Sequence, residues 1–560
     1  MIVKKTIQFW LKYFPALTSG FFLTLSFPDT GISYLVFFAL IPLLVSIQSM
    51  TYKESFYAGF ITGIIYFLTL IYWIVPTIHV YGGLHLIFAV GVLILLCLYL
   101  ALYPAIFSFT LKNFSFPNTN IKTDNLTPGN SFNNSYRSYF IPLFAALLWT
   151  GLEYIRTYAF TGFSWGTLGY SQFNNLNLIQ IADVTGIYGI SFLIVLVNSS
   201  LSLLWINFKK KLKQKYNIPI IYTIALVAVT YLYGNLKIND IDDKIKTAQT
   251  SKISIIQGNI KQNLKWSEEF KLKTVEKYIQ LSKTQIKNNP ELIIWPETAL
   301  PFYYGLDKIL SYHVNKSVKS SQSNFLIGSP AFENDKEKTK FYNRAYMLDR
   351  FANITGTYDK HHLVPFGEYV PFGEYLTFLG KITAQAGNFS PGEQEFKPLE
   401  FSNHNLKVTR TQRAETKTGI LICFEILFPS IASKFVKNGA DILTIITNDA
   451  WFGHSSAAMQ HFSIAVFRAV ENRRTVARAA NTGISGFIDP KGKIIKTTTL
   501  FTDRAITCQI PILTHISFYT KYGDLFAMGS IFTVFVILAI LANGMGFMLK
   551  GFKKKFGGRK

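Results

Sequence analysis

Residues 419–435, GILICFEILFPSIASKF, join an apolar strand-like run to a helix-like segment, and Cys423 stands at the junction. A short β-branched run of this kind is typical of a strand buried on both faces. A cysteine at a strand-to-helix turn presents its sulfur to the first helical amides, which favour a thiolate. An unreactive core cysteine fits the same pattern, so the rest of the chain has to decide between the two interpretations.

The alternation of strands and helices continues on both sides, from about residue 250 to 515. Strand-like runs lie at 253–259, 291–297, 324–330, 342–349, 419–425, 441–449 and 485–490, and helix-like segments lie near 267–288, 306–320, 429–438 and 456–479. Repeated units of this length predict an α/β domain with helix-covered sheets.

The remainder of the 560-residue chain is strongly apolar, with 49% hydrophobic and 16% aromatic residues overall. Stretches of about 20 apolar residues cross a bilayer. We predict eight spans, at 7–26, 32–48, 55–76, 83–110, 138–156, 187–206, 217–234 and 525–549. The fold class is therefore a multi-pass α-helical membrane domain at 1–235, an extracytoplasmic domain at 250–515, and an eighth helix with a basic tail at 522–560. A signal peptide is the alternative for the first span.

The charges fit this arrangement and fix its orientation. The loops on the side of the two termini carry 17 basic and two acidic residues, whereas the opposite short loops carry Asp29 and Asp183 and no Lys or Arg. By the positive-inside rule, both termini are cytoplasmic. The bias explains most of the formal charge of +24 without nucleic acid. Three cysteines are too few for a disulfide framework.

Two further residues share the context of Cys423, at a strand end or in a loop. Glu297 follows the apolar run LIIWP, and Lys360 lies in the loop TYDKHHLVP. A carboxylate can take the proton of a thiol, and an ammonium can stabilise both a thiolate and an oxyanion. A surface acid and a solvated lysine are the ordinary alternatives.

Together these residues and their flanks resemble a known family. Glu, Lys and Cys in this chain order resemble the catalytic triad of the nitrilase superfamily. The flanks at 295–301 (WPETALP), 358–371 (YDKHHLVPFGEYVP), 419–425 (GILICFE) and 447–492 (from TNDAWFG to FIDPKG) are similar to its membrane-embedded branch, the apolipoprotein N-acyltransferases. The resemblance implies a four-layer αββα sandwich on a membrane bundle.

The resemblance also assigns roles to matching positions. Cys423 becomes the nucleophile, Glu297 the general base and acid, and Lys360 the oxyanion stabiliser. Glu368 and Glu425 match acids that assist the site, and Trp266 matches a tryptophan on a substrate-facing loop. Because VPFGEY is repeated, Glu374 is a rival to Glu368, which has the family's spacing from the lysine.

The implied reaction is acyl transfer from a phospholipid, through a Cys423 thioester, to a diacylglyceryl-modified apolipoprotein. The implied location is the bacterial inner membrane with a periplasmic catalytic domain, and we expect a monomer without metal or cofactor. A membrane-tethered amidase and an inert transporter or scaffold are the alternatives. Apolar residues of the loop 366–379 could enter the membrane interface, and Arg468, Glu471, Arg474 and Arg478 have the helical spacing of an ion-pair network.

Overall fold

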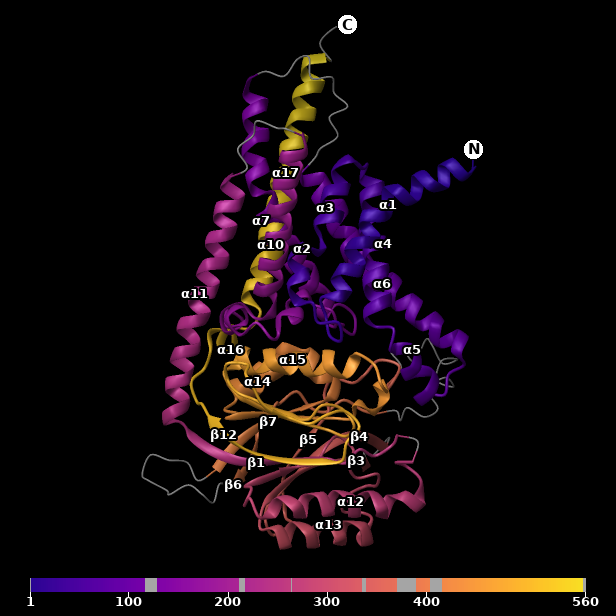
Figure 1. Ribbon diagram of the computed structural model, residues 1–560, viewed down its shortest axis with the longest axis vertical. Helices are drawn as coiled ribbons and strands as arrows, with labels where there is room; N and C mark the ends of the chain where they lie inside the picture. Colours follow the sequence, from indigo (N-terminus) through magenta and orange to yellow (C-terminus); the bar gives the residue numbers. More distant parts are fainter. Residues whose placement is uncertain are drawn as a thin grey trace.

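The computed structural model describes residues 2–115, 128–210, 217–262, 264–334, 339–369, 389–402 and 415–556. A helical region and an α/β domain lie end to end along the long axis (Figure 1). Both chain ends lie at the helical end of the molecule. All the strands of the described residues, from Gln249 to Ile512, belong to the α/β domain.

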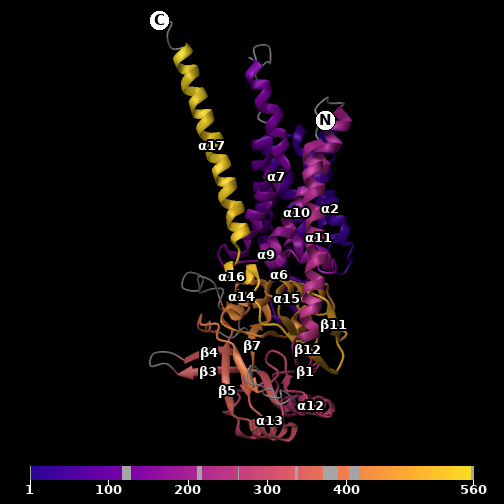
Figure 2. The ribbon, with the colours of Figure 1, turned by 90° about the vertical axis from the view of Figure 1, so that its left-hand side faces the viewer.

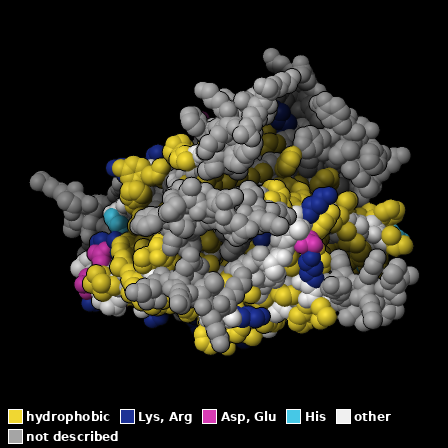
Figure 3. Space-filling view, turned by 90° about the horizontal axis from the view of Figure 1, so that it is seen from above, with side chains coloured by type: hydrophobic (Ala, Val, Ile, Leu, Met, Phe, Trp, Pro, Cys, Tyr) yellow, Lys and Arg dark blue, Asp and Glu magenta, His cyan; other side chains and the backbone are white. Residues whose placement is uncertain are grey.

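The helical region consists of long helices with short ones packed between them. Its helices are α1 (Ile2–Leu25), α2 (Val36–Ala39), α3 (Ile41–Ser46), α4 (Tyr52–Leu70), α5 (Ile74–Pro76), α6 (Leu86–Ser115), α7 (Pro128–Tyr158), α8 (Leu176–Ile179), α9 (Ala182–Thr185), α10 (Ile187–Lys210), α11 (Asn217–Thr247) and α17 (Leu525–Phe556). In the side view, α17 leans away from α7, α10 and α11 (Figure 2). Seen from this end, hydrophobic side chains cover much of the described surface (Figure 3).

Among the described residues, four helices are long and apolar enough to cross a membrane, at Leu86–Phe114, Ile187–Lys209, Ile218–Thr247 and Leu525–Ala542. The pair Tyr52–Leu70 and Ile74–Tyr81, bent by 56°, would make a fifth. The count of eight is thus not confirmed. The second predicted interval is broken into short helices between Ser33 and Ser49, and α11 continues 13 residues beyond its predicted end at 234.

Two six-stranded mixed sheets form the core of the α/β domain. The first has the order β12-β1-β2-β3-β4-β5 and the second the order β11-β10-β9-β8-β7-β6. The strands are β1 (Gln249–Gln257), β2 (Leu292–Ile294), β3 (Asn324–Asn334), β4 (Thr339–Leu348), β5 (Ile354–Asp359), β6 (Leu399–Ser402), β7 (Glu415–Ile422), β8 (Ile442–Thr447), β9 (Thr475–Ala480), β10 (Gly486–Ile488), β11 (Ile494–Thr497) and β12 (Arg504–Ile512).

Helices cover the outer face of each sheet. The helices α12 (Glu268–Ile286) and α13 (Lys308–Ser321) lie on the face farthest from the helical region, whereas α14 (Pro429–Lys437) and α15 (Ala457–Asn472) lie between the second sheet and that region (Figure 1). The short α16 (Phe518–Tyr522) leads into α17. The expected αββα order is therefore present, with the second helical layer packed against the helical region.

The helix predicted at 456–479 is wrong at its end. It stops at Asn472, Arg473 takes a left-handed conformation with φ of 51°, and residues 475–480 form the buried strand β9. A left-handed residue terminates a helix because it cannot continue the hydrogen-bond ladder. The alternation pattern also did not indicate β5, β6, β11 and β12.

Candidate active site

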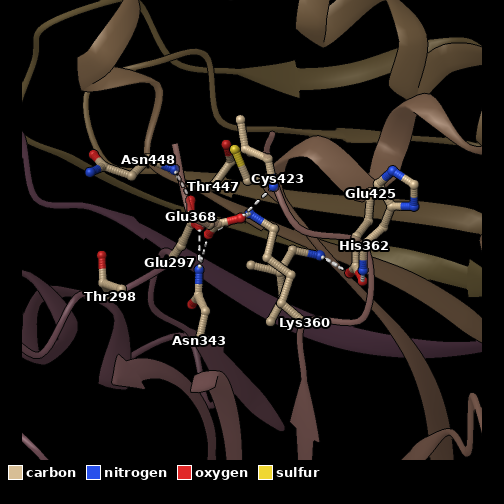
Figure 4. Close-up of polar contacts among 12 residues, drawn as sticks. Glu297, Thr298, Asn343, Lys360, His362, Glu368, Cys423, Glu425, Thr447 and Asn448 are labelled. Carbon is tan, nitrogen blue, oxygen red and sulfur yellow. Dashed lines mark hydrogen bonds and ion pairs between the residues drawn. The ribbon is translucent and has the colours of Figure 1, made fainter. Parts of the chain in front are cut away.

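The topology brings the three predicted residues to one place between the sheets. β2 runs parallel to β3, and β3, β4 and β5 alternate in direction, so β2 and β5 end at the same edge of the first sheet. Glu297 follows β2 and Lys360 follows β5. In the second sheet β7 and β8 are parallel, so Cys423 and Asn448 also share an edge. Figure 4 shows these side chains converging.

Glu297 is held on both oxygens by neutral donors. Its Oε1 accepts a 2.7 Å hydrogen bond from Asn343 Nδ2, and its Oε2 accepts a 2.8 Å hydrogen bond from the backbone amide of Asn448. Lys360 Nζ lies 3.6 Å from Oε1. The carboxylate is 6% exposed and fixed in orientation before any substrate binds.

Lys360 lies between two carboxylates and is 1% exposed. Its Nζ is 2.9 Å from Glu368, which also accepts a 2.8 Å hydrogen bond from the amide of Val364 through Oε2. Burial alone lowers the pKa of Lys360, but Glu368, Glu297 and Cys423 together raise it above its usual value. The lysine is therefore a permanent cation at the site.

Cys423 occupies a strained position at the end of β7, where a 3-10 turn (Cys423–Leu427) begins. Its φ of 51° lies in the left-handed region, which costs a residue with a Cβ roughly 1–3 kcal/mol. Burial and Glu297 raise the pKa of Cys423, whereas Lys360 lowers it, and the net shift is upward. The resting sulfur is thus a thiol. Burial thus opposes the thiolate that a position at a strand-to-helix turn favours.

Glu425 joins the nucleophile turn to the lysine loop. It is fully buried, and its Oε1 accepts hydrogen bonds from the Tyr358 hydroxyl at 2.7 Å and the amides of His361 and His362 at 2.8 and 3.1 Å. Its Oε2 accepts from the Ile422 amide at 2.8 Å. Burial raises the pKa of Glu425 to about 7. These contacts fix the positions of Cys423 and Lys360 relative to each other.

Lys265, next to Trp266 in the sequence, is buried against the turn that carries Glu297. Its Nζ donates to Thr298 Oγ1 at 2.6 Å, and burial lowers its pKa to about 8. The Trp266 side chain itself is 48% exposed. The buried lysine thus anchors the loop on which the exposed tryptophan lies.

The sequence did not predict Asn343 as a site residue, and it assigned Asn448 no role there. Asn343 Nδ2 contacts Glu297 Oε1 and, at 3.2 Å, Glu368 Oε1. Asn448 Oδ1 accepts from Asn481 Nδ2 at 3.0 Å. A buried amide within β4 was the only available signal for Asn343. Glu374, and the part of the loop 366–379 beyond residue 369, lie outside the described residues.

The helical region reaches the site through the loop that follows α7. Ser164 Oγ donates to the carbonyl of Leu427 at 2.6 Å, and the carbonyl of Thr161 lies 3.0 Å from His362 Nε2. Trp165 Nε1 donates to Gln460 Oε1 at 2.7 Å. One short loop therefore contacts the nucleophile turn, the lysine loop and α15.

The ion-pair network expected after residue 453 is partly present. Arg468 pairs with Glu471 at 3.0 Å, but Arg478 pairs with Asp449 at 2.8 Å. Arg474 donates to backbone carbonyls, including that of Ala440 at 2.8 Å. The structural interpretation is confirmed for the first pair, and helical spacing did not reveal the other partners.

Comparison with known proteins gives matches along most of the chain. The family model for the apolipoprotein N-acyltransferase N-terminal domain matches residues 19–200, and that for carbon-nitrogen hydrolases matches residues 252–515. A Geobacter metallireducens protein named apolipoprotein N-acyltransferase is 38% identical over 94% of this chain and 95% of its own length. A protein of the same name from Pasteurella multocida is 28% identical over 98% of both chains.

Among solved structures, Saccharomyces cerevisiae Nit3, a member of branch 10 of the nitrilase superfamily, matches with a TM-score of 0.34 and 17% identity. The match covers 47% of this chain and 90% of that one. The full-length relatives and the two family models decide the assignment. The chain belongs to the apolipoprotein N-acyltransferase family.

Proposed function

We propose that this protein transfers a fatty acyl group from a membrane phospholipid, through a thioester on Cys423, to the N-terminal amino group of the diacylglyceryl-cysteine of apolipoproteins. The observation that carries the proposal is the convergence of Glu297, Lys360 and Cys423 where a loop of the helical region contacts the site. The names of the full-length homologues supply the acceptor.

The first half-reaction forms the thioester. Glu297 takes the proton of the Cys423 thiol as the sulfur attacks the ester carbonyl carbon of the phospholipid. The negative charge that develops on the carbonyl oxygen faces the Lys360 ammonium. The carbon–oxygen bond of the ester then breaks, and the leaving alkoxide takes the proton from Glu297 to give a lysophospholipid. A base is needed because the resting sulfur is protonated.

The second half-reaction forms the amide. The α-amino group of the modified cysteine attacks the thioester carbonyl and gives a proton to Glu297. The carbon–sulfur bond breaks, and Glu297 returns the proton to the Cys423 sulfur. Glu425 acts by positioning, since its contacts are with Tyr358 and the backbone.

The proposed topology has eight spans, cytoplasmic termini and a periplasmic catalytic domain. Its support is the basic bias of the loops on the terminal side, together with helical structure in all eight intervals. A helix of 30 residues such as α6 is about 45 Å long, more than the roughly 30 Å of a hydrocarbon core, so it must tilt or project. We also propose that the protein acts as a monomer.

Intact-protein mass spectrometry after incubation with a defined phospholipid tests the covalent step. We expect an acyl adduct that hydroxylamine removes, that is absent from Cys423→Ser, and that persists in the matched variant Cys508→Ser. An adduct that persists in Cys423→Ser contradicts the assignment. Adding a diacylglyceryl-cysteine peptide should then transfer the acyl group to the peptide. Release of free fatty acid alone would favour the hydrolytic alternative.

A further inference from the structure

A buried imidazole on α15 contacts the backbone of the nucleophile, whereas Glu297 and Lys360 follow strands of the first sheet. His461 on α15 is 1% exposed, and its Nε2 is 3.3 Å from the carbonyl oxygen of Cys423. Its Nδ1 is 2.9 Å from Arg478 Nη2 and 3.1 Å from Asp449 Oδ1. The proposed mechanism uses none of these three side chains.

The surrounding groups determine which nitrogen carries a proton. Nδ1 faces both the Arg478 guanidinium, which can only donate, and the Asp449 carboxylate, which can only accept, whereas Nε2 faces the Cys423 carbonyl, which can only accept. In the neutral ring a proton on Nε2 therefore satisfies two of these three contacts, and a proton on Nδ1 satisfies one. A protonated ring, paired with Asp449, also carries a proton on Nε2. The remaining neutral tautomer would direct a lone pair at the Cys423 carbonyl. In both favourable states His461 therefore donates to that carbonyl.

Asp449 and Arg478 form a fixed support for this imidazole. Arg478 Nη2 donates to Asp449 Oδ2 at 2.8 Å, and Thr447 Oγ1 donates to Asp449 Oδ1 at 2.9 Å. Burial opposes ionisation of Asp449, but Arg478 and His461 hold its pKa well below the usual value. The carboxylate thus stays charged and oriented.

Two aromatic rings pack against His461, one from the helical region and one from the α/β domain. The Trp165 ring stacks on His461 with centroids 5.6 Å apart and planes 18° apart, and Phe452 meets the ring edge-on at 6.0 Å. Trp165 also donates to Gln460, the residue that precedes His461. The imidazole is therefore fixed by both regions of the molecule.

We propose that His461 is a positioning residue for Cys423. Its hydrogen bond holds the Cys423–Phe424 peptide unit in the left-handed turn that directs the sulfur at Glu297 and Lys360. The Cys423 residue has an unfavourable φ of 51°, so an external contact is needed to favour this conformation over an extended one. The inference rests on the proposed function only where acyl transfer is measured; the alkylation of Cys423 described below is independent of that function.

Three variants at residue 461 separate the hydrogen bond from packing. His461→Gln places an amide nitrogen near the position of Nε2 and keeps the donor. His461→Phe keeps a ring against Trp165 without a donor, and His461→Asn has a donor too short to reach Cys423. If either His461→Phe or His461→Asn does not fold, the other still removes the hydrogen bond and tests the proposal. Each is assayed below its own melting temperature.

The first readout is the rate at which iodoacetamide alkylates Cys423, followed by mass spectrometry of the peptide that carries it. We expect a decrease of about 10- to 100-fold in His461→Phe and His461→Asn, with most of the rate recovered in His461→Gln. Equal rates in all three variants, or a wild-type rate in His461→Phe, would overturn the proposal. This readout needs no lipid, so it stands even if the proposed acyl transfer is wrong.

The second readout is single-turnover thioester formation from phospholipid. We expect the maximal rate to fall in His461→Phe while the half-saturating phospholipid concentration stays unchanged, and His461→Gln to restore the rate. A change in the half-saturating concentration alone would assign His461 to substrate binding and overturn the positioning role. Absence of thioester in the wild type, with the alkylation pattern intact, would contradict the proposed function and not this inference.

Discussion

The backbone amide of Asn448 donates a 2.8 Å hydrogen bond to Glu297 Oε2, and this bond crosses from one sheet to the other. Asn448 follows β8 of the second sheet, whereas Glu297 follows β2 of the first. The proposed base is therefore aligned by the sheet that carries the proposed nucleophile. A shift of one sheet against the other would therefore change the distance between Glu297 and Cys423.

Glu297→Gln is expected to slow thioester formation about 10²- to 10⁴-fold, the usual contribution of a general base. The amide is isosteric but cannot accept the thiol proton. Rapid-quench measurement of the acyl adduct gives the rate, and Glu333→Gln, at an exposed end of β3, is the control. Unchanged kinetics in Glu297→Gln would assign the base to another group.

Lys360→Met is expected to lower the same rate about 10²- to 10³-fold, as loss of an oxyanion donor does. It should also destabilise the protein by about 3–5 kcal/mol, because Glu297 and Glu368 lose their shared cation. Adding Glu368→Gln should restore part of the melting temperature but not the rate. Recovery of both would mean that Lys360 is structural. Lys417→Met, on a more exposed pair with Glu400, is the matched control.

Asn343→Asp is expected to reduce activity at neutral pH and to shift its acid limb to higher pH. The new carboxylate would lie at the position from which Asn343 Nδ2 now donates to Glu297 Oε1 at 2.7 Å. Like charges at this distance raise the pKa of the pair, so more of the base is protonated at a given pH. The pH profile of thioester formation measures the shift. An unchanged profile would exclude Asn343 from the environment of the base.

Glu425→Gln is expected to change how stability depends on pH. The pKa of Glu425 rises from 4.5 to about 7 on burial, so the folded state binds more protons between these values and stability falls as pH rises through this window. The shift corresponds to about 3 kcal/mol. Glutamine does not titrate, so the stability of the variant relative to wild type should increase by about that amount from pH 4.5 to above pH 7. Melting curves in detergent across this range measure it, and parallel curves would contradict it.

The proposed orientation is tested by single cysteines on the two sides of the membrane, in a background without exposed native thiols. Ser320→Cys, on the exposed surface of α13, should react with a membrane-impermeant maleimide in intact spheroplasts. Lys555→Cys, in the basic tail, should react only after permeabilisation. The reverse pattern would invert the topology.

The positions of Glu297 and Cys423 were predictable, because each follows an apolar run that forms a strand, β2 or the end of β7. The strand β9 was not predictable, because only Arg473, which is left-handed, and Arg474 separate it from the end of α15. Asn343 was missed because its contact with Glu297, 46 residues earlier in the chain, depends on the strand order β2-β3-β4. The raised pKa of Cys423 depends on burial, which local sequence does not report.

Only Ala248 separates the end of α11 from the start of β1. Lys491, in the turn after β10, also forms an ion pair with Asp242 near the end of α11. The α/β domain is therefore joined to α11 by a one-residue connection and by an ion pair, so the two are expected to move together. In the proposed reaction the sulfur of Cys423 would then keep a constant height relative to the helical region, so acyl chains of different length would differ only in where their methyl ends lie.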